Sequence, residues 1–246
     1  MCLLSIAYQL HPDYPLVFVG NRDEYHARPT QAADWWVNAP DVLGGRDLEA
    51  GGTWLAINRA GHFGVVTNRP DLPQPDQDPR SRGELVTDWV SNTNIFAELP
   101  DYHAQYGGFS LLLADRQELR RLSGGYGAGN LLAHTLVSGV TGLSNTPPDQ
   151  PWPKLVWLNQ QLSDQLAGNP PDIESLMALL MRTDPVPDSA SQGIEAQPFV
   201  LGKEYGTRCS TVITINRKGT CTFHERRFGP AGVPTGESAY RFSLED

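Results

Sequence analysis

Short apolar runs joined by turn-forming residues dominate the first third of the chain. Residues 3–10 and 16–20 are separated by His-Pro-Asp-Tyr-Pro, and residues 53–58 and 62–68 are separated by Arg-Ala-Gly. Apolar runs of this length with such turns between them are typical of β-hairpins. The chain is therefore constrained to form antiparallel sheet, and its first strand begins beside the second residue, Cys2.

The middle and the end of the chain add more strands and three helices. Apolar residues at helical spacing predict helices over 82–90, over 152–166 and from Asp172 onward, with Ser81 and Asp172 as N-caps. Strands at both ends with helices between them favour an α+β fold, a four-layer α/β/β/α sandwich of two antiparallel sheets. Further strands are expected over residues 109–114, 118–124, 134–142, 210–216, 221–228 and 240–244.

Composition narrows the class of protein. A chain of 246 residues with 39% hydrophobic content suits a single domain over residues 1–246. The net charge of -9 and the lack of a basic run argue against a partner that is nucleic acid or an anionic membrane. No segment reaches the roughly 18 to 20 consecutive apolar residues of a membrane span, and the first residues lack the features of a secretory signal.

The cysteine count points to a reducing compartment. The chain has three cysteines, Cys2, Cys209 and Cys221, which lie far apart in the sequence. An odd number of widely spaced cysteines fits free thiols rather than a disulfide framework. We therefore expect a soluble, cytoplasmic protein.

Cys2 is the first candidate for chemistry. If Met1 is removed, this residue carries both a thiol, of pKa about 8.5, and a free α-amine, of pKa about 7.7 to 8.0. The amine can then act as the general base for its own thiol, and Arg22 and Asp23, at the end of the second predicted strand, can orient and stabilise the pair. The alternative is that Cys2 is an ordinary small apolar residue at the edge of a strand.

Three other polar residues lie at or just beyond the ends of predicted strands: Asn68, Asn145 and Arg208. An Asn side chain can donate to a developing oxyanion, which is worth about 2.7 to 4 kcal/mol when the donor is preorganised. An Arg can fix a thiolate or a carboxylate. The alternatives are that the two Asn residues shape turns and that Arg22 forms a structural ion pair with Asp23 or Glu24.

The order of these segments resembles that of penicillin V acylase and bile-salt hydrolase relatives. The resemblance rests on the N-terminal cysteine, the strand ending in GNRDE, the hairpin GGTWLAINRAGHFGVVTNRP, the segment LSNTPPDQPWPKL and the strand GTRCSTVI. It implies the N-terminal-nucleophile hydrolase fold. Arg22 and Asp23 are adjacent here, whereas the relatives space them further apart. The catalytic set that the resemblance implies is Cys2, Arg22, Asp23, Asn68, Asn145 and Arg208.

Nearly the whole chain is similar to the NRDE family, which includes the transport and Golgi organisation protein two of animals. The similarity is carried by MCL, GNRDEY, ARPT, GGRDLEAGGTWLAIN and VTNRP. The family is associated with intracellular haem trafficking and with lipid or acyl-coenzyme A metabolism. The resemblance therefore favours a protein that uses an acylase-like cleft around Cys2 to bind and traffic haem or a similar hydrophobic anion, such as acyl-coenzyme A.

This ligand-handling hypothesis requires no permanent cofactor, with haem as a candidate ligand. Candidate iron ligands are Cys2, His26 and His62, although a lone histidine is more often a surface or core residue. No CxxCH motif is present for covalent haem attachment, and neither the histidines nor the cysteines have the spacing of a metal site. The expected ligand-binding residues are Asn21, Arg22, Asp23, Glu24, His26, His62 and Trp54.

Two alternatives stay open. In the first, the protein is a hydrolase in which Cys2 attacks an amide or thioester carbonyl. In the second, it is an adaptor that holds partners through the proline-rich segments 70–79 and 185–198. Segments of that composition are usually solvated connections. Dependence of an activity on Cys2 distinguishes the hydrolase from the other two.

Overall fold

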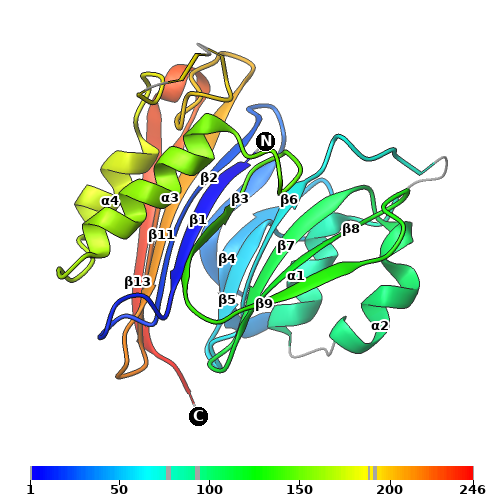
Figure 1. The fold of residues 1–246 in the computed structure, drawn as a ribbon, viewed down its shortest axis with the longest axis horizontal. Helices are drawn as coiled ribbons and strands as arrows, with labels where there is room; N and C mark the ends of the chain where they lie inside the picture. The colour runs from blue at the N-terminus through cyan, green and yellow to red at the C-terminus, as the bar shows by residue number, and fades with distance from the viewer. Residues whose placement is uncertain (1, 76–78, 92–94, 188, 191–192, 246) are drawn as a thin grey trace. The chain divides into compact units, whose positions relative to one another are not determined.

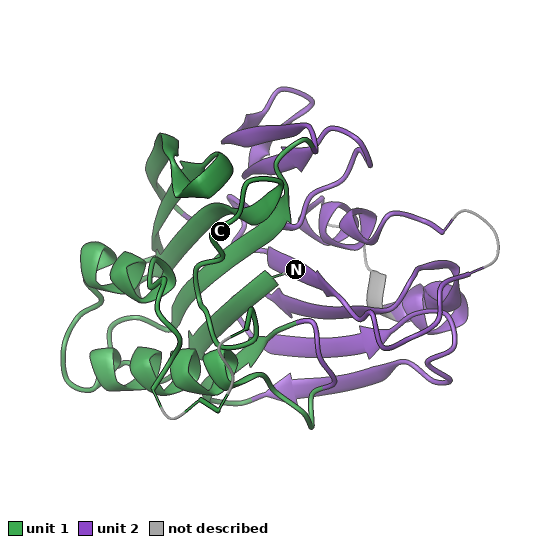
Figure 2. Cartoon of the chain, turned by 90° about the horizontal axis from the view of Figure 1, so that it is seen from above, with its two compact units in different colours: residues 1–27, 137–144, 148–243 green, residues 28–136, 145–147, 244–246 purple. Residues whose placement is uncertain are grey.

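The computed structural model describes residues 2–75, 79–91, 95–187, 189–190 and 193–245. The contacts of the chain group into two compact units, which Figure 2 colours separately. Unit 1 comprises residues 1–27, 137–144 and 148–243, and unit 2 comprises residues 28–136, 145–147 and 244–246. Each unit draws on distant parts of the chain, and the expectation of a single domain stays a prediction.

Unit 1 is built on a six-stranded antiparallel sheet with the strand order β10-β1-β2-β11-β12-β13. Helices α3 (Pro153–Leu166) and α4 (Ile173–Leu180) pack on β1, β2 and β11 (Figure 1). Leucines at helical spacing in α3 and α4 make a buried cluster with Leu3, Val19 and Val212 of the sheet. A 3-10 turn, η2 (Pro230–Gly232), precedes β13. The strands are β1 (Cys2–Tyr8), β2 (Leu16–Tyr25), β10 (Gly139–Leu143), β11 (Tyr205–Ile215), β12 (Thr220–Phe228) and β13 (Pro234–Ser243).

Unit 2 is built on a seven-stranded antiparallel sheet in which the strands follow in chain order. Helix α1 (Arg82–Val90) packs on β5 and β6, and α2 (Ile95–Tyr102) and the 3-10 turn η1 (His103–Gln105) follow it. The buried cluster beneath α1 joins Leu85 and Trp89 to the sheet. The strands are β3 (Thr30–Trp36), β4 (Ala39–Asp47), β5 (Leu55–Asn58), β6 (Phe63–Asn68), β7 (Phe109–Ala114), β8 (Leu119–Gly124) and β9 (Leu132–Leu136).

The α+β class with two antiparallel sheets is confirmed, and so are both N-terminal hairpins, β1-β2 and β5-β6. The three predicted helices are also present. Asp172 caps α4, because its carboxylate accepts a hydrogen bond from the backbone N–H of Ser175 at 2.9 Å. No helix formed by the described residues has the length and hydrophobicity needed to cross a bilayer.

The prediction of one strand over residues 134–142 is wrong. The segment forms the end of β9 in the seven-stranded sheet and the beginning of β10 in the six-stranded sheet. The change from one sheet to the other occurs at Gly139, whose φ of 118° is a conformation that favours glycine. The sequence analysis also missed β3, β4 and α2. Strand β3 lies at the edge of its sheet, where only two of its seven residues are buried, and it contains no continuous apolar run.

Candidate functional site

Cys2 is the first residue of β1 and lies directly opposite Arg22 of β2, which in turn lies opposite Cys209 of β11. Directly opposed residues of antiparallel strands project from the same face of the sheet. The neighbouring residue Leu3 packs with α3 and α4, so Cys2, Arg22 and Cys209 project from the face opposite these helices. Cys2 is half-buried, and Arg22 and Cys209 are buried.

The environment of Cys2 disfavours its thiolate. Burial raises the pKa of the Cys2 thiol, and the carboxylate of Asp23 raises it further. The guanidinium of Arg22 and a backbone hydrogen bond from Asp23 act in the opposite direction. Because burial is the largest influence, the thiol is protonated at neutral pH and needs a base to become a nucleophile.

Asp23 is a buried carboxylate beside this thiol. Its Oδ1 accepts a hydrogen bond of 2.7 Å from the hydroxyl of Thr207, and its backbone carbonyl accepts one of 3.0 Å from Tyr205. Burial raises the pKa of Asp23, whereas the charges of Lys154 and Arg22 and the hydrogen bond from Thr207 lower it. The residue is only 1% exposed, so these partners are what make a charge tolerable at this position.

Lys154 is the residue that the sequence analysis missed. It lies in the first turn of α3 and is completely buried, and its Nζ donates to the carbonyl of Gln197 at 3.2 Å. Burial lowers the pKa of Lys154, and the nearby Asp23 and Cys2 counteract this shift. The sequence did contain a signal that Lys154 is buried. This residue lies four residues before Leu158 and so extends the apolar face of α3.

Arg208 lies inside β11 rather than at a strand end, so the predicted position is wrong. Thr207 pairs with Asp23 and Cys209 pairs with Arg22, which leaves Arg208 as the extra residue of a β-bulge. Its Nη1 donates to the carbonyl of Tyr25 at 2.8 Å. Burial and the charge of Arg22 lower the pKa of Arg208. The bulge therefore brings a second guanidinium into the electrostatic field of Arg22.

The other residues of the NRDE motif extend β2 instead of ending it. Asn21 is buried, and its side-chain amide donates to the carbonyls of Leu180 and Pro198 at 2.8 and 2.9 Å, while its oxygen accepts from Ser210 at 2.6 Å. These three bonds tie β2 to the end of α4 and to β11. The carboxylate of Glu24 accepts from the backbone N–H of the next residue at 2.8 Å.

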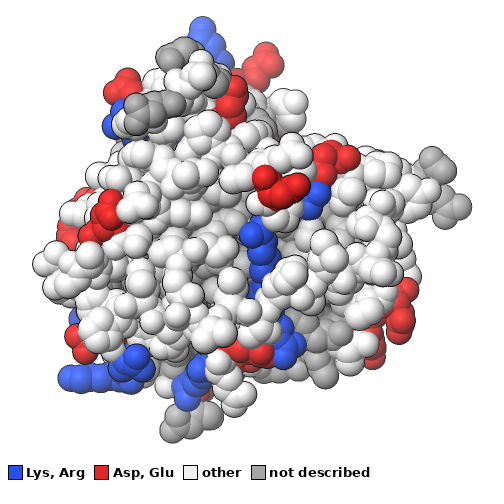
Figure 3. All heavy atoms as spheres, in the orientation of Figure 1, with Lys and Arg blue, Asp and Glu red and all other residues white. Residues whose placement is uncertain are grey.

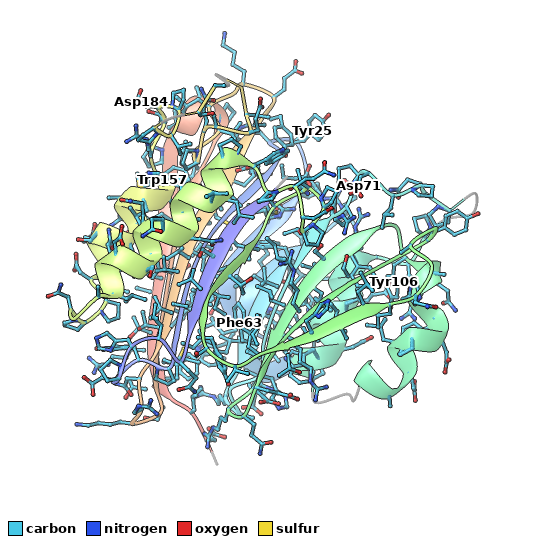
Figure 4. All side chains as sticks on the ribbon, viewed as in Figure 1. Tyr25, Phe63, Asp71, Tyr106, Trp157 and Asp184 are labelled. Atoms are coloured by element: carbon cyan, nitrogen blue, oxygen red, sulfur yellow. The ribbon has the colours of Figure 1, made fainter. Side chains whose placement is uncertain are left out.

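His26 follows β2. Burial lowers the pKa of His26, and the charge of Arg208 lowers it further. The neighbouring residue Tyr25, labelled in Figure 4, packs edge-on against Tyr205 with ring centroids 5.2 Å apart. A neutral imidazole close to Arg208 is the expected state at neutral pH.

Four of the predicted site residues belong to unit 2. The side-chain amide of Asn145, which is buried, donates to the backbone carbonyl of Asn68 at 2.9 Å, so the structure brings this pair together. His62 stacks on Trp89 with ring centroids 4.9 Å apart, which gives its ring a packing role. Trp54 approaches the backbone of Gly45 so closely that a side chain there would clash with its ring.

The predicted site residues divide between the two units. In unit 2 the structure pairs Asn145 with Asn68, whereas His62 and Trp54 make separate contacts. Among the described residues, no group of three His, Cys, Asp or Glu side chains could hold a metal ion. The group of unit 2 is Trp54, His62, Asn68 and Asn145. The group of unit 1 is Cys2, Asn21, Arg22, Asp23, Glu24, His26 and Arg208.

The group of unit 1 contains the kinds of side chain that acyl transfer requires. A thiol lies next to a buried carboxylate and within the field of the cations Arg22 and Lys154. Fixed charges in a partly buried site stabilise charge that develops during a reaction more strongly than the same charges in water. The arrangement also suits a bound anion, because Arg22 and Arg208 supply two neighbouring positive charges.

Two solved structures with the same fold are hydrolases by name. A Caenorhabditis elegans N-acylethanolamine-hydrolyzing acid amidase ortholog superposes with a TM-score of 0.55 over 86% of this chain and 92% of that chain, at 11% identity. A mutant conjugated bile acid hydrolase from Clostridium perfringens gives a TM-score of 0.56 over 99% and 92%, at 10% identity. At this level of identity the likeness shows the fold, which is that of the N-terminal-nucleophile hydrolases.

Sequence comparison is more specific than fold comparison. The Transport and Golgi organization 2 homolog of Mus musculus is 31% identical to this chain over 278 residues, and the match covers 100% of both proteins. The homolog of Bos taurus is 33% identical over 256 residues, with 92% of each chain covered. A family model described as Transport and Golgi organisation 2 matches residues 1–230. The chain therefore belongs to the Transport and Golgi organisation 2 family, whose NRDE motif lies here at residues 21 to 24.

Proposed function

We propose that this protein hydrolyses an amide or thioester bond with Cys2 as the nucleophile. The observation that carries the proposal is the position of Cys2 at the start of β1, opposite Arg22 and next to the buried Asp23 and Lys154. Burial of an ionisable group opposes folding because the group loses its hydration. A cluster of such groups beside a thiol is therefore a strong indication of a reaction site.

The reaction begins with removal of Met1, which frees the α-amine of Cys2. This amine takes the thiol proton while the sulfur attacks the substrate carbonyl, and the ammonium then returns the proton to the leaving amine or thiolate. Water, deprotonated by the same amine, attacks the acyl-cysteine and releases a carboxylic acid and the regenerated thiol. Asp23 and Arg22 orient the amine and the sulfur throughout.

The resemblance assigns the oxyanion role to Asn68 and Asn145, and this assignment stays a prediction. Replacing Asn145 with Ala should lower kcat by about 10² to 10³ if the side chain donates to the oxyanion. The rate of Cys2 alkylation should stay unchanged in this variant, because alkylation forms no oxyanion. An unchanged kcat would remove Asn145 from the mechanism.

The substrate class follows from charge. The relatives that share the fold are named for an N-acylethanolamine and a conjugated bile acid, and the neighbouring guanidinium groups of Arg22 and Arg208 favour an anionic substrate. A fatty acyl group linked to an anionic carrier, such as acyl-coenzyme A, combines an apolar chain, a thioester carbonyl and phosphates. We therefore expect acyl thioesters to be cleaved faster than neutral acyl amides.

The decisive experiment pairs mass spectrometry with a substrate panel. The protein is expressed from its own start codon, and its intact mass is measured before and after treatment with a haloacetamide. Loss of Met1, alkylation at Cys2 and hydrolysis that disappears in Cys2→Ala support the proposal. Retention of Met1, or full hydrolysis by Cys2→Ala, contradicts it.

A second candidate function is binding and trafficking of haem or acyl-coenzyme A without hydrolysis, in the cytoplasm. It is favoured by two neighbouring guanidinium groups, those of Arg22 and Arg208, the first of which lies opposite Cys2. In this case Cys2→Ala keeps its affinity for acyl-coenzyme A, whereas Arg208→Gln weakens binding about tenfold, as expected for one charge-assisted contact. Arg120→Gln, which changes an arginine of the other unit that pairs with Glu118, serves as the control.

A further inference from the structure

Asn68 lies where β6 ends and a tight turn begins. It is the last residue of the strand, it pairs with Phe109 of β7, and it is exposed. The backbone N–H of the next residue, Arg69, donates to the carbonyl of Gly108 at 2.9 Å. The main chain is therefore still held by backbone hydrogen bonding one residue beyond the end of the strand.

The turn that follows consists of Arg69, Pro70, Asp71 and Leu72. The backbone N–H of Leu72 donates to the carbonyl of Arg69 at 3.2 Å, which closes the turn. Proline is favoured at the second position of such a turn because its ring fixes φ. The carbonyl of Arg69 also lies against Gly108, where an added Cβ would be only 2.6 Å from it. The sequence of the turn and the neighbouring glycine thus fix the main chain beside Asn68.

The side chain of Arg69 makes a second set of contacts. Its Nε and Nη2 donate to the two oxygens of Asp71, at 2.7 and 2.6 Å, in the loop labelled at Asp71 in Figure 4. Its Nη1 donates to the hydroxyl of Ser123 on β8 at 2.8 Å. This hydroxyl donates in turn to the carbonyl of Phe109 at 3.4 Å. Because β7 lies between β6 and β8, the guanidinium ties the turn to the next strand but one.

The ion pair of Arg69 with Asp71 is shielded from water. Figure 3 shows that the charged side chains of one molecular face are scattered over a mostly uncharged surface, where solvent screens them. The Arg69 side chain is instead only 10% exposed, and that of Asp71 is 32% exposed. Hydrogen bonds from Arg69 hold the pKa of Asp71 below its usual range, although partial burial opposes them. The carboxylate is therefore ionised at neutral pH, and the pair has the bidentate geometry of a strong contact.

One peptide group connects this ion pair to Asn145. The buried side-chain amide of Asn145 donates to the carbonyl of Asn68 at 2.9 Å. That carbonyl and the N–H of Arg69 belong to the same planar peptide group. A rotation of this group would break the bond from Asn145 together with the bond from Arg69 to Gly108. The arrangement of the two asparagines therefore depends on how firmly Arg69 is held.

We propose that Arg69 and Asp71 are positioning residues, which hold Asn68 and Asn145 in the geometry needed to stabilise an oxyanion. They act through the peptide group between Asn68 and Arg69 rather than on the substrate. The inference rests on the function proposed for Cys2, in which the two asparagines donate to the oxyanion. Preorganised donors stabilise developing charge without reorienting during the reaction. Loss of the ion pair should therefore lower kcat and leave KM nearly unchanged.

The first test is the hydrolysis of octanoyl-coenzyme A or N-octanoyl glycine, whichever the parent protein cleaves faster. Asp71→Asn keeps the shape of the side chain and removes its charge. Its kcat should fall about tenfold, less than for outright loss of an oxyanion donor, with KM within about twofold of the parent. Alkylation of Cys2 should keep its rate, because it forms no oxyanion. The matched control is Glu118→Gln, which removes the carboxylate of a similarly exposed ion pair with Arg120 and should change none of these values.

The second test, hydrogen exchange followed by NMR, does not depend on hydrolysis. In Asp71→Asn the side-chain amide of Asn145 and the backbone N–H of Arg69 should exchange about tenfold faster than in the parent, because the peptide group between Asn68 and Arg69 is less firmly held. Arg69→Lys should behave in the same way, since an ammonium keeps the charge but cannot reproduce the planar fork of a guanidinium. Glu118→Gln should exchange at the parent rates.

The two tests separate positioning from a structural role. If Asp71→Asn lowered only the melting temperature, with kcat and the exchange of Asn145 unchanged, the ion pair would be structural and the proposal would be overturned. If the parent protein cleaved neither compound, the function proposed for Cys2 would fail. Faster exchange of Asn145 in Asp71→Asn would then still support the positioning of the two asparagines, and unchanged exchange would overturn it.

Discussion

The region around Cys2 and the core beneath α1 bury different kinds of side chain. Around Cys2, the six-stranded sheet buries Asp23 and Arg22, and α3 adds Lys154. Beneath α1, the seven-stranded sheet buries a cluster that contains Leu85 and no charged side chain among its described members. One region surrounds ionisable groups with hydrogen bonds, whereas the other excludes water from apolar surface.

The core beneath α1 stabilises the protein, whereas the region around Cys2 supplies groups that can take part in chemistry. Burial of apolar surface stabilises a fold by about 25 cal/mol for each Å² removed from water. Burial of a charge opposes folding unless partners compensate it, and replacing buried ion pairs with apolar residues is often neutral or stabilising. We therefore expect substitutions beneath α1 to change stability alone, and substitutions near Cys2 to change stability together with the reactivity of the thiol.

Leu85→Ala should give the largest effect. Leu85 is fully buried in α1, and alanine is a good helix former, so the loss is one of packing. We expect the free energy of unfolding to fall by about 3 to 5 kcal/mol, as for other Leu to Ala changes that leave a cavity. Denaturant unfolding measures the change, and the alkylation rate of Cys2 should stay within about twofold of the parent under native conditions.

The control for Leu85→Ala is Leu48→Ala, since Leu48 is 57% exposed in the same unit. Its free energy of unfolding should change by less than about 0.5 kcal/mol. If Leu85→Ala slowed alkylation of Cys2 as strongly as it lowered stability, the separation between the two regions would fail.

Lys154→Met should give the next largest effect and should change both properties. Methionine keeps the apolar stem but removes the charge that faces Asp23 and Cys2. We expect the free energy of unfolding to fall by about 2 to 3 kcal/mol at about pH 8, less than for an unrelieved buried charge because Asp23 can take up a proton. Alkylation of Cys2 should become slower, because loss of a nearby positive charge raises the pKa of its thiol.

The pH dependence of Lys154→Met has a definite sign. The folded pKa of Asp23 is already raised above its ordinary value, and removal of Lys154 raises it more. The folded state then binds more protons than the unfolded state, so stability falls as pH rises from the ordinary aspartate pKa to the raised one. The destabilisation should therefore be smaller at about pH 5 than at about pH 8.

A double-mutant cycle tests the pairing of Lys154 with Asp23. Asp23→Asn removes the carboxylate that Lys154 compensates, so the double variant should be more stable than the sum of the single changes implies, by about 1 to 3 kcal/mol. An additive result would mean that the two residues do not interact, and the electrostatic account of this region would be wrong.

Much of the fold could be predicted because local signals agreed with the tertiary structure. The apolar runs of β1, β2, β5 and β6 became hairpins, and Asp172 capped α4 as its sequence position indicated. The edge strand β3 could not be found in this way, because only two of its seven residues are buried and no apolar run marks it. The division of residues 134–142 between two sheets depends on long-range pairing that no local pattern encodes.

The candidate site was predictable only in part, for the same reason. Cys2 lies on β1, and Arg22 and Asp23 lie on β2. These two strands form a hairpin, so the β1-β2 register places the three residues close together. Lys154 lies more than a hundred residues away, and only the packing of α3 against β1 brings it near Asp23. The bulge at Arg208 could not be predicted from the sequence either, because it depends on the register between β11 and β2.

Thr207→Val should give the smallest of the three effects and the sharpest test of the comparison. The buried hydroxyl of Thr207 donates to Asp23 at 2.7 Å and accepts from the backbone N–H of Val200 at 2.9 Å. Valine has nearly the same shape, so packing is kept while both hydrogen bonds are lost. We expect a decrease of about 1 to 2 kcal/mol in the free energy of unfolding, larger at high pH because loss of the donor raises the pKa of Asp23. Thr207→Ser should retain the hydroxyl and the pH dependence of the parent. If valine proved as stable as threonine at every pH, the region around Cys2 would be held by packing, as the core beneath α1 is, and its buried polar groups would have to be explained by function alone.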